Sequence, residues 1–184
     1  FQISVDELSK ALYRAQGIVE KKSTMPILSS VLIEAKKTPE GGRVTVSAYD
    51  LEVGVSGDHP AEVVKEGAVA LQARSLYDIV KNLPENVVVL KKGANNRVEI
   101  SSGTAEFKIV GQSAEEFPAL PKVDNVPFVQ VEVGALLEMI EKTQFAISTD
   151  ETRYNLNGVY FDPRETGTRM VATDGHRLAL IEKQ

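Results

Sequence analysis

The chain has 184 residues, of which 42% are hydrophobic and 26% charged, and a formal net charge of −5. This composition fits one or two globular domains with a real core and excludes a disordered tail. The absence of cysteine excludes disulfides and thiolate metal sites. No apolar run reaches the roughly 18 residues that span a bilayer, and no signal peptide is recognisable, so we expect a soluble cytoplasmic protein without membrane contact.

The first 57 residues predict a strand, a helix and three further strands. Residues 2–5 alternate as a strand, and Asp6 suits the N-cap of a helix whose apolar side carries Leu8 and Leu12. The expected strands that follow cover residues 27–35, 43–50 and 51–55. This stretch is the first repeat.

Residues 62–112 run through the same order and form the second repeat. The expected helix is capped by Ser75, and it lies between a strand at 68–73 and three strands at 87–91, 97–101 and 105–110. The first two repeats can close into one domain, with the helices on one side of a continuous antiparallel sheet. Prolines between residues 112 and 127 then indicate a linker.

Residues 128–184 restart the pattern as a third repeat. Up to Phe161, which matches Ile33, it aligns with the first repeat at an offset of 128. From Ala172 onwards the offset is 124, so the turn between these positions is four residues shorter in the third repeat. Matched pairs include Leu12 with Ile140, Leu28 with Leu156, Ala48 with Ala172, and Asp50 with Asp174. Constant offsets over apolar and polar positions indicate duplication, whereas chance matching of apolar periodicity is the alternative.

The duplication predicts an α+β fold of strand-helix-three-strand repeats, with antiparallel sheets outside and helices on one side. The third repeat has no partner in the chain. Half a domain leaves an apolar helix face and a sheet edge uncovered, which implies a fragment.

The pair Asp174-Gly175 lies between two alternating apolar runs and predicts a hairpin with a type I′ turn, with strands at 170–173 and 176–181. Such a turn would hold His176, Arg177 and Leu178 rigidly. Thr173, Asp174 and His176 do not suit a catalytic triad, because neighbouring turn residues point in diverging directions. No metal site or phosphate-binding loop is recognisable, so we expect a protein without catalysis or cofactor.

The candidate basic surface consists of five cations. They are Lys10, Arg14, Lys21, Lys22 and Arg74. A solvated helix face is the simpler interpretation. If the helices share one side of the sheet, however, these side chains could face a common phosphate backbone.

Several segments carry a family resemblance. They include Met-Pro-Ile-Leu at 25–28, Ala-Arg-Ser-Leu-Tyr-Asp-Ile-Val at 73–80 and Ala-Thr-Asp-Gly-His-Arg-Leu at 172–178. With them the chain resembles the bacterial sliding clamps, the beta subunits of DNA polymerase III. The resemblance implies a non-catalytic replication processivity factor, a head-to-tail homodimeric ring that encircles double-stranded DNA without reading its sequence. Residues 1–121 would be the first of three domains, including its linker, and 122–184 the first half of the second, with the third domain absent.

The resemblance also implies site residues. Lys22, Arg74 and Tyr154 match DNA backbone contacts, whereas Asp150 and Asn155 depart from the family pattern. Half of a peptide cleft would consist of Leu156, Thr173, Gly175, His176, Arg177 and Leu178. Phe107 and Ile109 match the subunit interface.

The partners implied are the catalytic subunit of DNA polymerase III, the clamp loader, other polymerases and repair proteins. The alternative from a different class is a repeat-built protein interaction scaffold without a DNA role.

Overall fold

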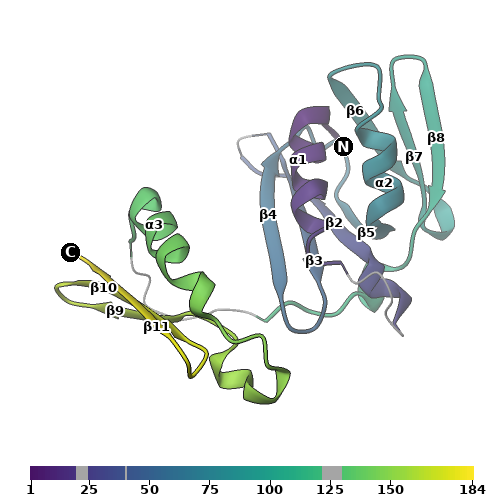
Figure 1. Cartoon of the computed structure of the whole chain (residues 1–184). Coiled ribbons are helices and arrows are strands. Elements are labelled where there is room, and N and C mark those ends of the chain that lie inside the picture. The colour runs from purple at the N-terminus through teal and green to yellow at the C-terminus, as the bar shows by residue number, and fades with distance from the viewer. Residues whose placement is uncertain (20–24, 40, 122–129) are drawn as a thin grey trace. The chain divides into compact units, whose positions relative to one another are not determined.

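The computed structural model describes residues 1–19, 25–39, 41–121 and 130–184 (Figure 1). The chain divides into an N-terminal body, Phe1–Lys122, and a C-terminal body, Val123–Gln184.

Two four-stranded antiparallel sheets and two helices build the N-terminal body. In chain order they are β1 (Gln2–Ser4), α1 (Val5–Ala15), β2 (Ser30–Lys36), β3 (Arg43–Tyr49), β4 (Gly54–Pro60), β5 (Gly67–Gln72), α2 (Ala73–Val80), β6 (Val87–Lys92), β7 (Arg97–Ser102) and β8 (Ala105–Val110). Short 3₁₀ helices cover Pro26–Ser29, Ala94–Asn96 and Ala114–Glu116.

The first two repeats exchange their first strands. The sheet orders are β1-β6-β7-β8 and β4-β3-β2-β5, so each repeat gives three strands to one sheet and its first strand to the other. The expectation of one continuous sheet was therefore wrong. The exchange satisfies one backbone edge of β6 and of β2 with a strand from the other repeat.

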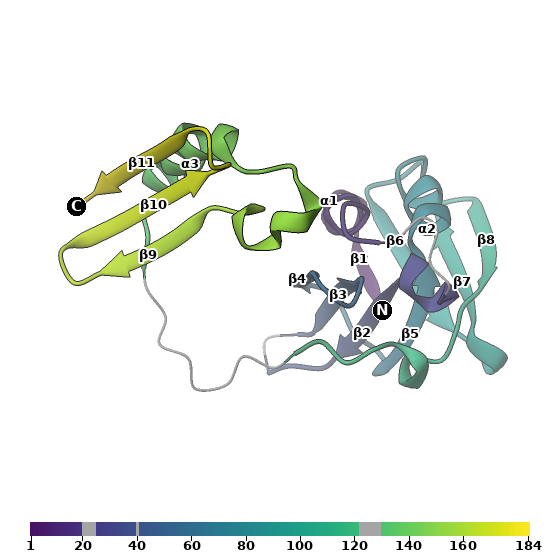
Figure 2. The same ribbon diagram turned by 60° about the horizontal axis from the view of Figure 1, so that its bottom comes forward.

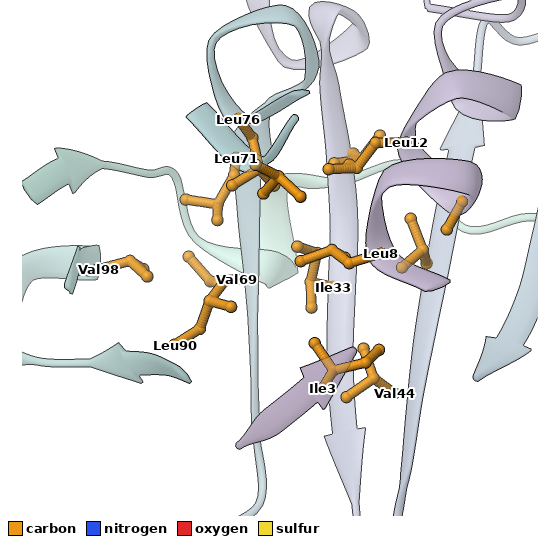
Figure 3. Packing of buried hydrophobic residues seen from close by; sticks show 14 of the residues in the cluster. Ile3, Leu8, Leu12, Ile33, Val44, Val69, Leu71, Leu76, Leu90 and Val98 are labelled. Carbon is orange, nitrogen blue, oxygen red and sulfur yellow. The ribbon is translucent and has the colours of Figure 1, made fainter. Parts of the chain in front are cut away.

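Both helices lie on one side of the sheets, as expected, and α1 and α2 lie next to each other (Figure 1). The ring centroids of Tyr13 and Tyr77 are 6.3 Å apart across the pair. Leu8 and Leu12 of α1 and Leu76 of α2 are fully buried against residues of both sheets, among them Ile33 (Figure 3). Burial of side chains of this size stabilises the fold by about 1.5–3 kcal/mol each.

Both helix starts differ from the expected ones. Helix α1 begins at Val5, so Asp6 lies in its first turn rather than at the N-cap, and its carboxylate accepts a hydrogen bond from the Lys10 ammonium at 2.6 Å. At α2 the cap is Gln72, whose side chain accepts a hydrogen bond from the Ser75 backbone N–H at 2.6 Å. Ser75 receives the cap instead of supplying it.

Two strand boundaries also differ. Residues 27–29 are 3₁₀ helix because Pro26 starts that turn and its carbonyl accepts a hydrogen bond from the Ser29 hydroxyl at 2.7 Å. Residues 50–53 form a turn, so β4 begins only at Gly54 and runs on to Pro60.

The C-terminal body has one helix against a three-stranded antiparallel sheet. It contains α3 (Val133–Thr143), β9 (Tyr160–Arg164), β10 (Gly167–Thr173) and β11 (Leu178–Lys183), with 3₁₀ helices at Gln144–Ala146 and Glu151–Leu156. The sheet order is β11-β10-β9. Among its described residues, 130–132 form no strand, so the expected first strand of the third repeat is missing there.

Strand registers confirm the duplication. Leu32 pairs with Ser47 in the first repeat, and Tyr160 pairs with Val171 in the third, as the two offsets require. The next hairpin agrees as well, since Tyr49 faces Gly54 and Thr173 faces Leu178.

The C-terminal body exposes the apolar surface expected of half a domain. Val133 and Leu137 of α3 and Phe161 of β9 are exposed, and within the described residues β9 pairs only with β10. No helix in the described ranges is long and apolar enough to cross a membrane.

Candidate functional site

The turn between β10 and β11 is held by Asp174. Its Oδ1 accepts hydrogen bonds from the backbone N–H groups of His176 and Arg177, each at 2.9 Å. These bonds lower the pKa of the Asp174 carboxyl to about 2. Gly175 has a positive φ of 87° while Asp174 does not, so the expected type I′ turn was wrong, because that turn needs both. His176 and Arg177 consequently belong to the turn and not to the returning strand.

Further contacts fix the orientation of the turn. The Arg177 Nε donates to Asp174 Oδ2 at 2.9 Å, and its guanidinium lies 5.8 Å from the centroid of the Phe145 ring. The Thr173 hydroxyl donates to the Arg177 carbonyl at 2.6 Å. The turn is therefore preorganised before any ligand arrives.

A surface pocket of about 400 Å³ lies beside the base of this turn. Residues 154–160, just before and within β9, form one wall, and Val171, Ala172 and Thr173 of β10 form the other. Of the six expected cleft residues, Leu156 and Thr173 line this pocket. Gly175, His176, Arg177 and Leu178 lie at or directly after the turn and are exposed, Leu178 by 63%.

The expected DNA-contact residue Tyr154 also lines the pocket, with 84% of its surface exposed. Asp150, which departs from the family pattern, caps the 3₁₀ helix Glu151–Leu156, whose last residues line the pocket. Its Oδ1 accepts hydrogen bonds from the hydroxyl and backbone N–H of Thr152, and they lower the pKa of the Asp150 carboxyl. Asp150 thus has a structural role in shaping this wall.

A second groove, of about 510 Å³, lies between α2 and the residues that directly follow α1 in the N-terminal body. Arg74, an expected DNA-contact residue, lines this groove. The sequence analysis did not identify the other lining residues Gln16, Tyr77 and Lys81 as site residues. Lys81 could have been found, because it follows Arg74 by two helical turns and therefore shares its face. The Lys81 ammonium lies 3.0 Å from Asp78, which offsets part of its charge.

The remaining expected cations are placed as follows. Lys10 and Arg14 are exposed on α1, and the Lys10 ammonium is paired with Asp6. Lys21 and Lys22 lie outside the described residues. The structure therefore brings Arg74 into the groove but leaves the grouping of all five cations a prediction.

Strand β8, which carries Phe107 and Ile109, is an edge of its sheet. Phe107 is 41% exposed, whereas Ile109 packs partly against the core. Within the described residues, no group of three or more His, Asp or Glu side chains could hold a metal ion.

The first two repeats exchange strands behind paired helices, and the third repeat has a pocket beside a fixed turn. Together these features define a repeat-built clamp fold. Sequence comparison agrees with this class. The family model described as DNA polymerase III beta subunit, N-terminal domain, matches residues 1–121, and that of the central domain matches 130–184. The chain belongs to the DNA polymerase III beta subunit family.

Individual relatives agree. The beta sliding clamp of Caulobacter vibrioides is 39% identical over 181 residues, which cover 95% of this chain and 48% of the relative. The sliding clamp structure from Bartonella birtlesii, solved with bound griselimycin, has a TM-score of 0.87 at 37% identity and covers 99% of this chain and 49% of that one. The structure of the beta subunit from Pseudomonas aeruginosa has a TM-score of 0.90 at 29% identity. It covers 100% of this chain and 49% of that one. The chain spans about half the length of the curated relatives it matches.

Proposed function

We propose that this chain forms the first domain and half of the second domain of a processivity clamp. The full protein would be a head-to-tail homodimeric ring that encircles duplex DNA and tethers DNA polymerase III, the clamp loader, other polymerases and repair proteins. Residues 1–121 would be the first domain with its linker, and 122–184 the first half of the second. The observation that carries the proposal is the match of two successive clamp domains in the family's own order.

The DNA-facing surface would be the helix side of the sheets. Arg74 lies in the groove between α2 and the residues that follow α1, and Lys10 and Arg14 are exposed on α1. Lys22 and Tyr154 are assigned to the same role by resemblance, and Lys21 as a member of the candidate basic surface beside Lys22. A ring holds DNA topologically and needs only contacts that are weak enough to let it slide. The net charge of −5 on this chain is therefore compatible with the proposed role.

The protein-binding surface would be the pocket beside the 174–177 turn. Leu156 and Thr173 would form its wall, and Gly175, His176, Arg177 and Leu178 its rim. Apolar side chains next to a rigid turn suit a short peptide with apolar anchors. A third domain in the full protein would supply the other half of this cleft.

The ring closure would use the β8 edge with Phe107 and Ile109. An edge strand has unpaired backbone groups, which pair readily with a strand from another subunit.

Retention on DNA tests the proposal. Full-length protein, loaded on nicked circular duplex, should stay bound through gel filtration and leave once the circle is cut. Equal retention on circular and linear DNA would contradict encirclement. No retention on either, together with binding to polymerase peptides, would favour the scaffold without a DNA role.

A further inference from the structure

The linker of the N-terminal body covers the surface that corresponds to the pocket of the C-terminal body. By the two offsets, the pocket residues Leu156, Tyr160 and Thr173 correspond to Leu28, Leu32 and Tyr49. The strand registers bear out this correspondence, because Leu32–Ser47 and Tyr160–Val171 are equivalent pairs. The two surfaces are therefore the same part of the repeat.

Two linker side chains fill this surface in the N-terminal body. Phe117 is only 6% exposed and belongs to a cluster with Ile27, Leu28 and Ala70. Leu120 packs against the same cluster, together with Leu32 and Tyr49. The cluster is separate from the main core between the helices and sheets.

The linker reaches this surface along the edge of β5 (Figure 2). Gln112 and Ala70 exchange backbone hydrogen bonds of 2.8 and 3.2 Å, and the Ser30 hydroxyl donates to the Gln112 side chain at 3.3 Å. A 3₁₀ turn at Ala114–Glu116 then brings Phe117 over the cluster in an extended conformation.

The segment has the form of a bound peptide. It presents an aromatic and a leucine three residues apart, and Pro118 between them favours an extended backbone. Glu115 and Glu116, directly before Phe117, are exposed. Buried apolar anchors within a short extended segment are a common mode of peptide recognition.

We propose that the N-terminal body holds a second peptide site, closed in cis by Phe117 and Leu120. Its ligand class is an extended peptide with an aromatic residue and a leucine three positions later. A tethered segment has an effective concentration of order millimolar, so dilute free peptides do not displace it. The linker thereby keeps free peptides out of this site in the N-terminal body.

The proposal concerns the N-terminal body alone and does not require peptide binding by the third repeat. Its failure would leave the proposed cleft at Leu156 unaffected, and failure of that cleft would leave this site unaffected.

The test uses the 184-residue chain with Phe117→Ala and Leu120→Ala combined. The probe is the nine-residue peptide of residues 113–121, Ser-Ala-Glu-Glu-Phe-Pro-Ala-Leu-Pro. The control peptide has alanine at both anchors. Calorimetric titration measures affinity, and NMR shift changes locate the bound peptide.

The peptide should bind the double variant about tenfold or more tightly than the unsubstituted chain, since its site is no longer filled by the tether. Shift changes should map to Leu28, Leu32 and Tyr49, and bound peptide should raise the melting temperature of the variant. Equal binding to both chains, equal binding of the control peptide, or shifts confined to Leu156 and Thr173 would overturn the proposal.

Leu120→Ala alone is the second variant, and it replaces the double variant in the test if that variant does not fold. It leaves Phe117 in place and should still bind the peptide more tightly than the unsubstituted chain. An affinity equal to that of the unsubstituted chain would again overturn the proposal.

Discussion

Asp50 and Asp174 hold the same turn in two different repeats. Asp50 Oδ1 accepts hydrogen bonds from the backbone N–H groups of Glu52 and Val53 at 2.9 and 2.6 Å, as Asp174 Oδ1 does from His176 and Arg177. In both repeats a four-residue connection joins the strands. The aspartate is thus part of the common scaffold, and the residues after it are free to differ.

Acid should loosen the 174–177 turn. In the folded chain the pKa of the Asp174 carboxyl is depressed from its ordinary value of 3.8 to about 2. A depressed pKa means that the turn gains stability above about pH 4 and loses it as the pH falls towards 2. Amide exchange at His176 and Arg177, followed over this range, should accelerate before that of β10.

Asp174→Asn is the matched control for this titration. The amide oxygen keeps an acceptor for the backbone N–H groups but does not titrate in this range, so its turn should show no acid loosening of its own. Equal acceleration in the variant and the unsubstituted chain would assign the effect to another group.

The residue after each aspartate has a left-handed backbone. Leu51 has φ of 81° and Gly175 has φ of 87°. Because this conformation strains residues with a side chain, Leu51→Gly should raise the free energy of unfolding by about 0.5 kcal/mol and Gly175→Ala should lower it by about 1 kcal/mol. Urea denaturation of each variant measures both changes.

Val53→Gly serves as the control for Leu51→Gly. Val53 lies in the same turn without a positive φ, so glycine there only adds freedom to the unfolded chain and should destabilise. If both glycine substitutions shift stability in the same direction, strain at Leu51 is not the cause.

Arg74→Ala should weaken DNA binding by the full-length protein equally for every DNA sequence, because the proposed contact is to the phosphate backbone. Removal of one phosphate contact should reduce the slope of log affinity against log salt by about one. Lys36→Ala, on β2 in the sheet rather than on a helix, is the control and should leave the slope unchanged. Fluorescence anisotropy at several salt concentrations separates the two results.

Leu156→Ala should weaken binding of a polymerase-derived peptide to the full-length protein by about tenfold, because it removes an apolar wall of the pocket. Val64→Ala removes an exposed apolar side chain of the N-terminal body and should have no effect. Comparable losses in both variants would argue against the pocket as the peptide site.

The 184-residue chain should bind the same peptide much more weakly than the full-length protein, since it carries only half of the proposed cleft. Parallel calorimetric titrations measure the two affinities. Equal values would show that the third domain contributes nothing to the cleft.

The sequence predicted the repeat and its register well. Leu28 and Leu156 match at the first offset and the turn aspartates at the second, and the observed strand pairs follow from these two offsets. The exchange of β1 and β5 was not predictable in the same way. Alternation within a strand indicates which face is buried but not which distant strand pairs with its edge.

Local chemistry explains the other differences. Ser75 is a typical N-cap residue and Gln72 is not, yet only Gln72 stands before the first helical residue with an acceptor within reach of the Ser75 N–H. Asp-Gly favours a tight two-residue turn. Here the Asp174 carboxylate also accepts a hydrogen bond from the Arg177 backbone N–H, and the connection between the strands has four residues. The pocket beside it depends on tertiary contacts between segments 154–160 and 171–173, which no local pattern specifies.

The strand exchange sets the order in which the protein can fold during synthesis. Gln2 pairs with Val89, so β1 cannot join its sheet until β6 has left the ribosome, although Gln2 can bridge to Glu62 before that. Such distant pairings slow folding, because a long loop must close before the contacts form. Residues 2–4 of the first repeat therefore stay outside their sheet until the second repeat has been made.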